Sequence, residues 1–117
     1  MSKTWTALLV KFVMTLIFAA ATLAFIRGNS WGWVFVVAVI ATILNYLVGD
    51  LLILPAFGNI TAAISDGIIG ALSAYVIDLL VPAFRTTTAA LLIFAILIAV
   101  GEYFFHQYLL RSEKVES

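Results

Sequence analysis

Four long apolar runs restrict this chain to a bundle of helices. They cover residues 5–26, 31–54, 59–80 and 86–110. Each run reaches the roughly 20 residues that a helix needs to cross the hydrocarbon core of a bilayer. The connections are short, so neighbouring helices must be antiparallel. The sequence therefore predicts an all-α fold, an antiparallel four-helix transmembrane bundle over residues 1–110, with residues 111–117 as a short polar C-terminal tail.

The composition agrees with a protein whose partner is the lipid bilayer. The chain is 65% hydrophobic and 10% charged, whereas soluble domains contain about 25% charged residues. Its formal net charge is zero, which gives no basic surface for a nucleic acid. The chain contains no cysteine, so disulfides and thiolate chemistry are excluded.

The turn residues set the expected helix ends. Pro55 lies after the second run and Gly58 follows closely, while Pro82 and Arg85 come after the third run. Proline cannot continue the backbone hydrogen bonding of a helix. We therefore expect the second helix to end at Leu54.

Five of the ionisable side chains within the apolar runs lie at similar depth. Counted along the helices, they fall roughly 6–12 Å from the same end of the predicted bundle. An intramembrane charge costs on the order of 2.5–3.5 kcal/mol on insertion scales. These residues form the predicted substrate- or ion-binding layer: Lys11, Asp50, Asp66, Glu102 and His106.

Helical spacing predicts that these side chains face one another. Glu102 and His106 are four residues apart and share one face of their helix. Asp66 shares a stripe with Asn59, and Lys11 shares one with Thr15. Each helix thus offers a polar face that can point inward.

Three readings of this layer stay open. The first is a pathway for protons or cations, or a site for a cationic substrate. The second is a purely structural network in a scaffold or accessory subunit. The third is that Asp50 and His106 extend to the membrane interface.

Catalytic and cofactor chemistry have little support in the sequence. One histidine with carboxylates is a thin ligand set for zinc, so neither a metal nor another cofactor is predicted. No glycine-rich phosphate-binding loop is present. We expect a protein that is not an enzyme.

Small residues follow one face of the third run. Ala63, Gly67 and Ala71 recur every four residues, and small residues let helices approach closely in lipid. We expect this helix to be the most buried, either inside the bundle or in a homodimer contact.

Basic residues outside the runs indicate the orientation. Lys3, Arg111 and Lys114 lie on one side, against Arg27 and Arg85 on the other. Positive residues favour the cytoplasmic side, which predicts that both termini are cytoplasmic.

Two families are similar to this chain. Small multidrug resistance exporters resemble it in architecture, but Lys11 replaces the glutamate of their first helix. The chain more closely resembles the YndM-like family through Asn45-Tyr-Leu-Val-Gly-Asp50, Ile53-Leu-Pro55, Gly58-Asn59 and Asp66-Gly67. That resemblance implies a small protein of the bacterial plasma membrane with no assigned activity, and it transfers no catalytic residue.

Overall fold

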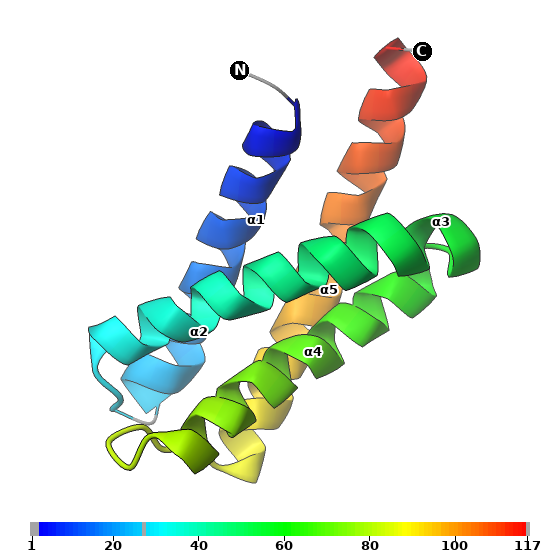
Figure 1. Cartoon of the computed structure of the whole chain (residues 1–117). Helices are drawn as coiled ribbons and strands as arrows, with labels where there is room; N and C mark the ends of the chain where they lie inside the picture. Colours follow the sequence, from blue (N-terminus) through cyan, green and yellow to red (C-terminus); the bar gives the residue numbers. More distant parts are fainter. Residues whose placement is uncertain (1–2, 27, 117) are drawn as a thin grey trace.

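The fold is a bundle of antiparallel helices, with no strand in residues 3–26 and 28–116 (Figure 1). Those residues are described by a computed structural model, which also describes the side chains of residues 5–24 and 28–108. The elements are α1 (Lys3–Ala19), η1 (Ala20–Ile26), α2 (Trp31–Leu44), η2 (Asn45–Ile53), α3 (Leu54–Phe57), α4 (Asn59–Leu80) and α5 (Thr88–Glu116). The predicted fold class is confirmed.

Consecutive elements join into long helical segments. Within the described part of the chain, four of them are long and apolar enough to cross a membrane: Trp5–Ala24, Trp31–Phe57, Asn59–Leu80 and Thr88–Tyr108. Figure 1 shows α1 beginning and α5 ending at the same end of the molecule. The basic side chains of Lys3, Arg27, Arg111 and Lys114 lie outside the described residues.

The second segment extends past the expected end at Leu54. Pro55 lies in the first turn of α3, which follows the π-helical segment η2 without a break. Local π-helical adjustments of this kind let a membrane helix accommodate a proline and its missing backbone N–H. The helix therefore continues to Phe57, and Gly58 alone makes the turn into α4. Its positive φ of 90° is a conformation that glycine adopts at no steric cost.

The ends of the fourth segment, α5, also differ from the predicted range of residues 86–110. The backbone N–H of Ala90 donates to the hydroxyl of Thr87 at 3.2 Å, as a side chain does when it caps a helix N-terminus. The helix accordingly begins at Thr88 rather than at Thr86. The backbone stays helical to Glu116, so most of the segment predicted as a tail continues α5.

Two segments are π-helical, η1 and η2. In η2 the backbone N–H of Leu54 donates to the carbonyl of Gly49, five residues earlier. π-Helical turns are rare in proteins, and those that occur are often found at functional sites. Asp50 lies inside η2, so the wider turn helps to set the direction of its side chain.

Small residues let α4 pack closely against α5. A Cβ on Gly67 would collide with the backbone carbonyl of Ala95, and a Cβ on Gly70 would collide with Ile98. Ala63 is also buried. The small-residue face of α4 therefore makes a contact inside the bundle, and homodimerisation through Ala63, Gly67 and Ala71 stays a prediction.

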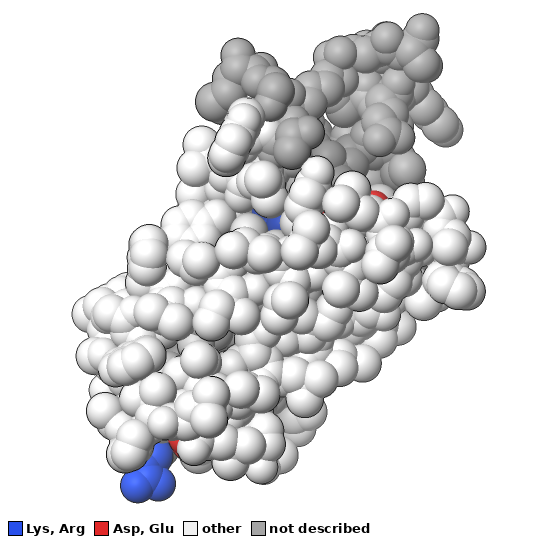
Figure 2. Space-filling view, in the orientation of Figure 1, with Lys and Arg blue, Asp and Glu red and all other residues white. Residues whose placement is uncertain are grey.

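The outside of the bundle is apolar. Large side chains such as Leu52, Phe57 and Leu80 are at least 65% exposed. Figure 2 shows a face made almost entirely of uncharged residues, with only small patches of charged ones. Soluble proteins rarely expose a continuous apolar surface of this extent, so this exterior suits contact with acyl chains.

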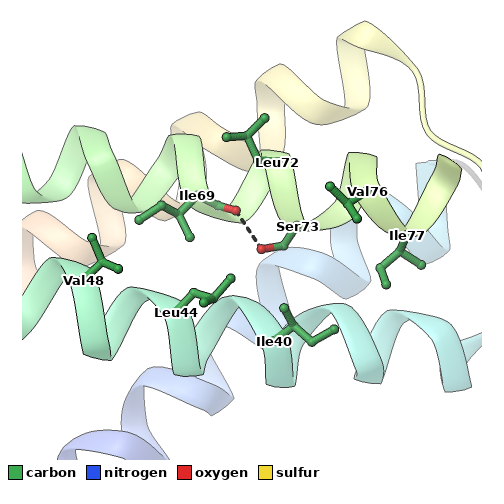
Figure 3. Close-up of a pocket in the computed structure, with 8 residues that line it drawn as sticks. All are labelled: Ile40, Leu44, Val48, Ile69, Leu72, Ser73, Val76 and Ile77. Atoms are coloured by element: carbon green, nitrogen blue, oxygen red, sulfur yellow. Dashed lines mark hydrogen bonds between the residues drawn. The ribbon is translucent and has the colours of Figure 1, made fainter. Parts of the chain in front are cut away.

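A pocket of about 410 Å³ lies between α2–η2 and α4 (Figure 3). Its one polar side chain, Ser73, donates a hydrogen bond to the carbonyl of Ile69 in the same helix at 2.8 Å. The other lining residues are aliphatic: Ile40, Leu44, Val48, Ile69, Leu72, Val76 and Ile77. This pocket thus offers no free polar partner, and the ionisable chemistry lies elsewhere.

Polar side chains form hydrogen bonds in the turns at the end of the bundle opposite the chain termini. The amide of Asn29 donates to the carbonyl of Arg85 at 2.6 Å and accepts from the N–H of Arg85 at 2.8 Å. Asp78 accepts from the backbone N–H of Thr86 at 3.0 Å and from its hydroxyl at 2.5 Å. The Asn29 contacts join the two turns on that side, and the Asp78 contacts close the α4–α5 turn.

The α4–α5 contact yields a first prediction. In Gly67→Ala the new methyl group meets a backbone carbonyl held by α5. Overpacking costs about 1–3 kcal/mol, more than the helix propensity that alanine adds, about 1 kcal/mol. We expect a lower thermal unfolding midpoint in detergent.

Gly32→Ala is the matched control, because no atom lies within 4 Å of its new Cβ. This variant should unfold at or above the wild-type midpoint. A Gly67→Ala protein as stable as Gly32→Ala would contradict the close packing of α4 on α5.

Candidate functional site

Five ionisable side chains meet in the interior, near the end of the bundle where α1 begins and α5 ends. Lys11 comes from α1, Asp50 from η2, Asp66 from α4, and Glu102 and His106 from α5. Asp50 is 8% exposed, and the other four are 0% exposed. We call these five residues the charged cluster.

Lys11 is the cationic centre of this cluster. Its ammonium forms a buried ion pair with Glu102, and Nζ lies 3.5 Å from Oδ1 of Asp50 and 3.9 Å from Oδ2 of Asp66. Nζ also lies 5.0 Å from the ring centroid of Phe105, within the range of a cation–π interaction. One lysine thus contacts acids from three other helical segments.

His106 contacts the same three acids as Lys11. Its Nε2 lies 3.0 Å from Oδ1 of Asp50, 3.1 Å from Oδ2 of Asp66 and 3.3 Å from Oε2 of Glu102. Its Nδ1 lies 2.9 Å from Oδ1 of Asn59. The imidazole is therefore held between an amide and a ring of carboxylates.

Gly49 makes room for this arrangement. A Cβ at this position would overlap the carboxylate of Asp66. The glycine backbone in η2 therefore allows Asp66 of α4 to lie directly against the second helical segment. Asp50, the residue after Gly49, contacts His106.

Several carboxylate oxygens in the charged cluster lack a hydrogen-bond donor. Oδ1 of Asp66, Oε1 of Glu102 and Oδ2 of Asp50 are buried without such a partner. Buried polar atoms are nearly always hydrogen-bonded, and an unsatisfied one can signal an absent water or ion. The cluster therefore has unused capacity to accept protons or bind a cation.

Further unsatisfied polar groups lie deeper in the bundle. Thr15 is one helical turn beyond Lys11, and Asn45 is one π-helical turn before Asp50. The hydroxyls of Thr15 and Thr42 and both amide atoms of Asn45 are buried without a hydrogen-bond partner. These three residues, the polar track, extend from the charged cluster toward the opposite end.

The sequence correctly predicted that the five ionisable residues would meet, and the ion-pair distances confirm it. Asp50 and His106 point at each other rather than at an interface. Sequence reasoning did not anticipate the contacts of Asn59, Gly49 and Phe105. For Asn59 the signal was its spacing of two turns from Asp66. The role of the cluster in binding a substrate or ion stays a prediction.

A double-mutant cycle tests the central ion pair. Lys11→Met leaves buried carboxylates without their cation, which we expect to cost about 3–5 kcal/mol. Adding Glu102→Gln removes one negative charge, so the double variant should be less destabilised than the two single effects added together. Unfolding of the three variants in detergent measures this coupling; single effects that add within about 0.5 kcal/mol would contradict the contact.

Comparison with known proteins matches nearly the whole chain to one family. No curated protein and no solved structure matches the chain. The sequence profile of one family, described as "Protein of unknown function (DUF2512)", matches residues 2–117. That match covers the four apolar helices and all five residues of the charged cluster, and the chain therefore belongs to the DUF2512 family.

Proposed function

We propose that this chain is an integral membrane protein of the bacterial plasma membrane, and that it acts as a small proton- or cation-linked transporter or channel. The observation that carries the proposal is the charged cluster, which joins all four long helical segments. The bacterial location rests on the resemblance to the YndM-like family. We place both termini in the cytoplasm, and the charged cluster in the cytoplasmic half of the membrane.

The apolar exterior supports membrane insertion. Side chains as large as Phe57 and Leu80 are exposed on helices that are long enough to cross a bilayer. In lipid these side chains would contact acyl chains, whereas in water they would favour aggregation. Polar residues such as Lys11 and Glu102 are instead buried inside.

The charge balance supports binding of a positive species. Three ionised carboxylates carry three negative charges, and Lys11 offsets one of them. A protonated His106 would offset a second. One negative charge then remains in a site of low dielectric, where an uncompensated charge is strongly unfavourable. A further proton or a bound cation would neutralise it.

The polar track supports a route toward the cluster. Thr15, Thr42 and Asn45 are buried and lack hydrogen-bond partners. Ordered water commonly satisfies such groups in protein interiors, and ionisable residues beside internal polar groups are a feature of proton relays in membrane proteins. The π-helical turn at Asn45–Ile53 adds a backbone segment of a kind often found at functional sites.

One observation favours the alternative of a non-enzymatic scaffold or accessory subunit. Lys11, Asp66, Glu102 and His106 are all 0% exposed, so the described structure is closed over the cluster. A transporter would have to open it during each cycle. A scaffold would keep it closed, with the ion pairs specifying how the helices pack.

Ion flux into proteoliposomes separates these functions. With an imposed pH or cation gradient, the wild-type protein should give flux above that of empty liposomes. Asp66→Asn should reduce this flux at least about tenfold, because Asp66 is fully buried with one oxygen, Oδ1, free of a hydrogen-bond donor, and intramembrane acids mark ion pathways. Asp78→Asn is the matched control, since Asp78 binds Thr86 in a distant turn.

The flux and stability measurements are read together. Flux that depends on Asp66 but not on Asp78 would support transport. Wild-type flux equal to that of empty liposomes would contradict it, and a lower thermal midpoint of Asp66→Asn in that case would favour the scaffold.

A further inference from the structure

The hydrogen bonds of Asn59 determine which nitrogen of His106 carries a proton. The amide nitrogen of Asn59 donates to the backbone carbonyl of Tyr103 at 3.0 Å, which orients the amide. Its oxygen then faces Nδ1 of His106 at 2.9 Å. Because an amide oxygen only accepts hydrogen bonds, Nδ1 must carry the hydrogen. In a neutral imidazole, Nε2 is therefore the atom with the free lone pair.

That lone pair points at negative groups. Nε2 lies 3.0–3.3 Å from one oxygen each of Asp50, Asp66 and Glu102. Electron-rich atoms at this separation repel one another unless a positive species lies between them. A proton on Nε2 can be shared with only some of these oxygens, whereas a metal ion can contact all four donor atoms.

The distances from Nε2 to the three carboxylate oxygens fit donor atoms around one ion. Bonds of about 2.1 Å place adjacent ligands about 3.0–3.4 Å apart in octahedral or tetrahedral coordination. One donor atom from each of Asp50, Asp66, Glu102 and His106 lies within 4.8 Å of all the others. Oδ1 of the fully buried Asp66 has no hydrogen-bond partner, and Oδ2 faces Nε2.

Metal ligation requires a neutral imidazole, and in that state charge balance favours a divalent ion. With neutral His106, three carboxylates and the Lys11 ammonium leave two negative charges. One divalent cation brings the buried site to neutrality, whereas a monovalent cation leaves one negative charge uncompensated. Lys11, whose ammonium contacts the same three carboxylates, then acts as the fixed positive group that completes this balance.

We propose that the charged cluster binds one divalent first-row transition-metal ion through Nε2 of His106 and carboxylate oxygens of Asp50, Asp66 and Glu102. Mixed imidazole and carboxylate ligands suit ions such as Mn²⁺, Fe²⁺ or Zn²⁺, whereas Mg²⁺ and Ca²⁺ prefer oxygen alone. Asn59 orients the imidazole, as hydrogen-bonded partners of metal-binding histidines do. This inference rests on the proposed function and names the cation that it would carry.

Metal binding to the purified full-length protein in detergent tests the inference directly. After removal of metal with a chelator, the protein is titrated with Mn²⁺, Zn²⁺ and Mg²⁺, and bound metal is measured by equilibrium dialysis and elemental analysis. We expect one Mn²⁺ or Zn²⁺ per chain, binding at least about tenfold tighter than Mg²⁺ because Mg²⁺ favours oxygen ligands. Spin-echo spectra of bound Mn²⁺ should show coupling to one histidine nitrogen.

Three variants give distinct outcomes. His106→Gln should lose the nitrogen coupling and weaken Mn²⁺ binding at least about tenfold, as expected for loss of a ligand. Asp78→Asn, far from the site, should bind like the wild type. Lys11→Met should bind Mn²⁺ more tightly by at least about tenfold, because it removes a nearby positive charge.

If Lys11→Met does not fold, the wild type and His106→Gln decide the matter. Wild-type binding below one ion per chain, or equal binding by His106→Gln, would overturn the metal site. The titration uses no membrane gradient, so its result is independent of transport. Proton flux without metal binding would overturn this inference alone, and metal binding without flux would overturn only the proposed transport.

Discussion

The contact of Lys11 with three buried carboxylates is the constraint on which the rest of the structure depends. Each acid belongs to a different helical segment, so the bundle has to bring all of them to one point. Charges removed from water are strongly unfavourable unless they are paired with good geometry. That requirement explains why Gly49, which lies against the carboxylate of Asp66, leaves no room for a side chain.

The same constraint separates the inside of this protein from its outside. Apolar side chains such as Leu52 cover the surface, and they supply little force for helix association in lipid, where acyl chains are equally apolar. Close packing of small residues and contacts between polar groups must hold the helices together there. The charged cluster thus has a structural effect whatever its function. Its surplus of acids and its unsatisfied oxygens distinguish it from a simple ion pair.

Much of this arrangement was predictable from sequence because helical periodicity gives both depth and face. Glu102 and His106 lie four residues apart, and Asp66 and Lys11 fall at similar depth, so their meeting followed from the pattern. The continuation of the second segment past Pro55 did not, because it depends on a local change to π-helical hydrogen bonding. The sequence also did not predict that Asn59 would orient His106. This orientation arises from contacts between α4 and α5 that sequence spacing within one helix cannot specify.

The most direct test of the central claim is the distance between the side-chain nitrogen of Lys11 and the side-chain carboxyl carbon of Glu102 in lipid bilayers. Solid-state NMR of protein labelled with ¹⁵N-lysine and ¹³C-glutamate measures it through their dipolar coupling. We expect a coupling that corresponds to a separation of about 4 Å or less, as in an ion pair. A coupling that places these atoms more than about 6 Å apart, beyond the contact distance of an ion pair, would contradict the account.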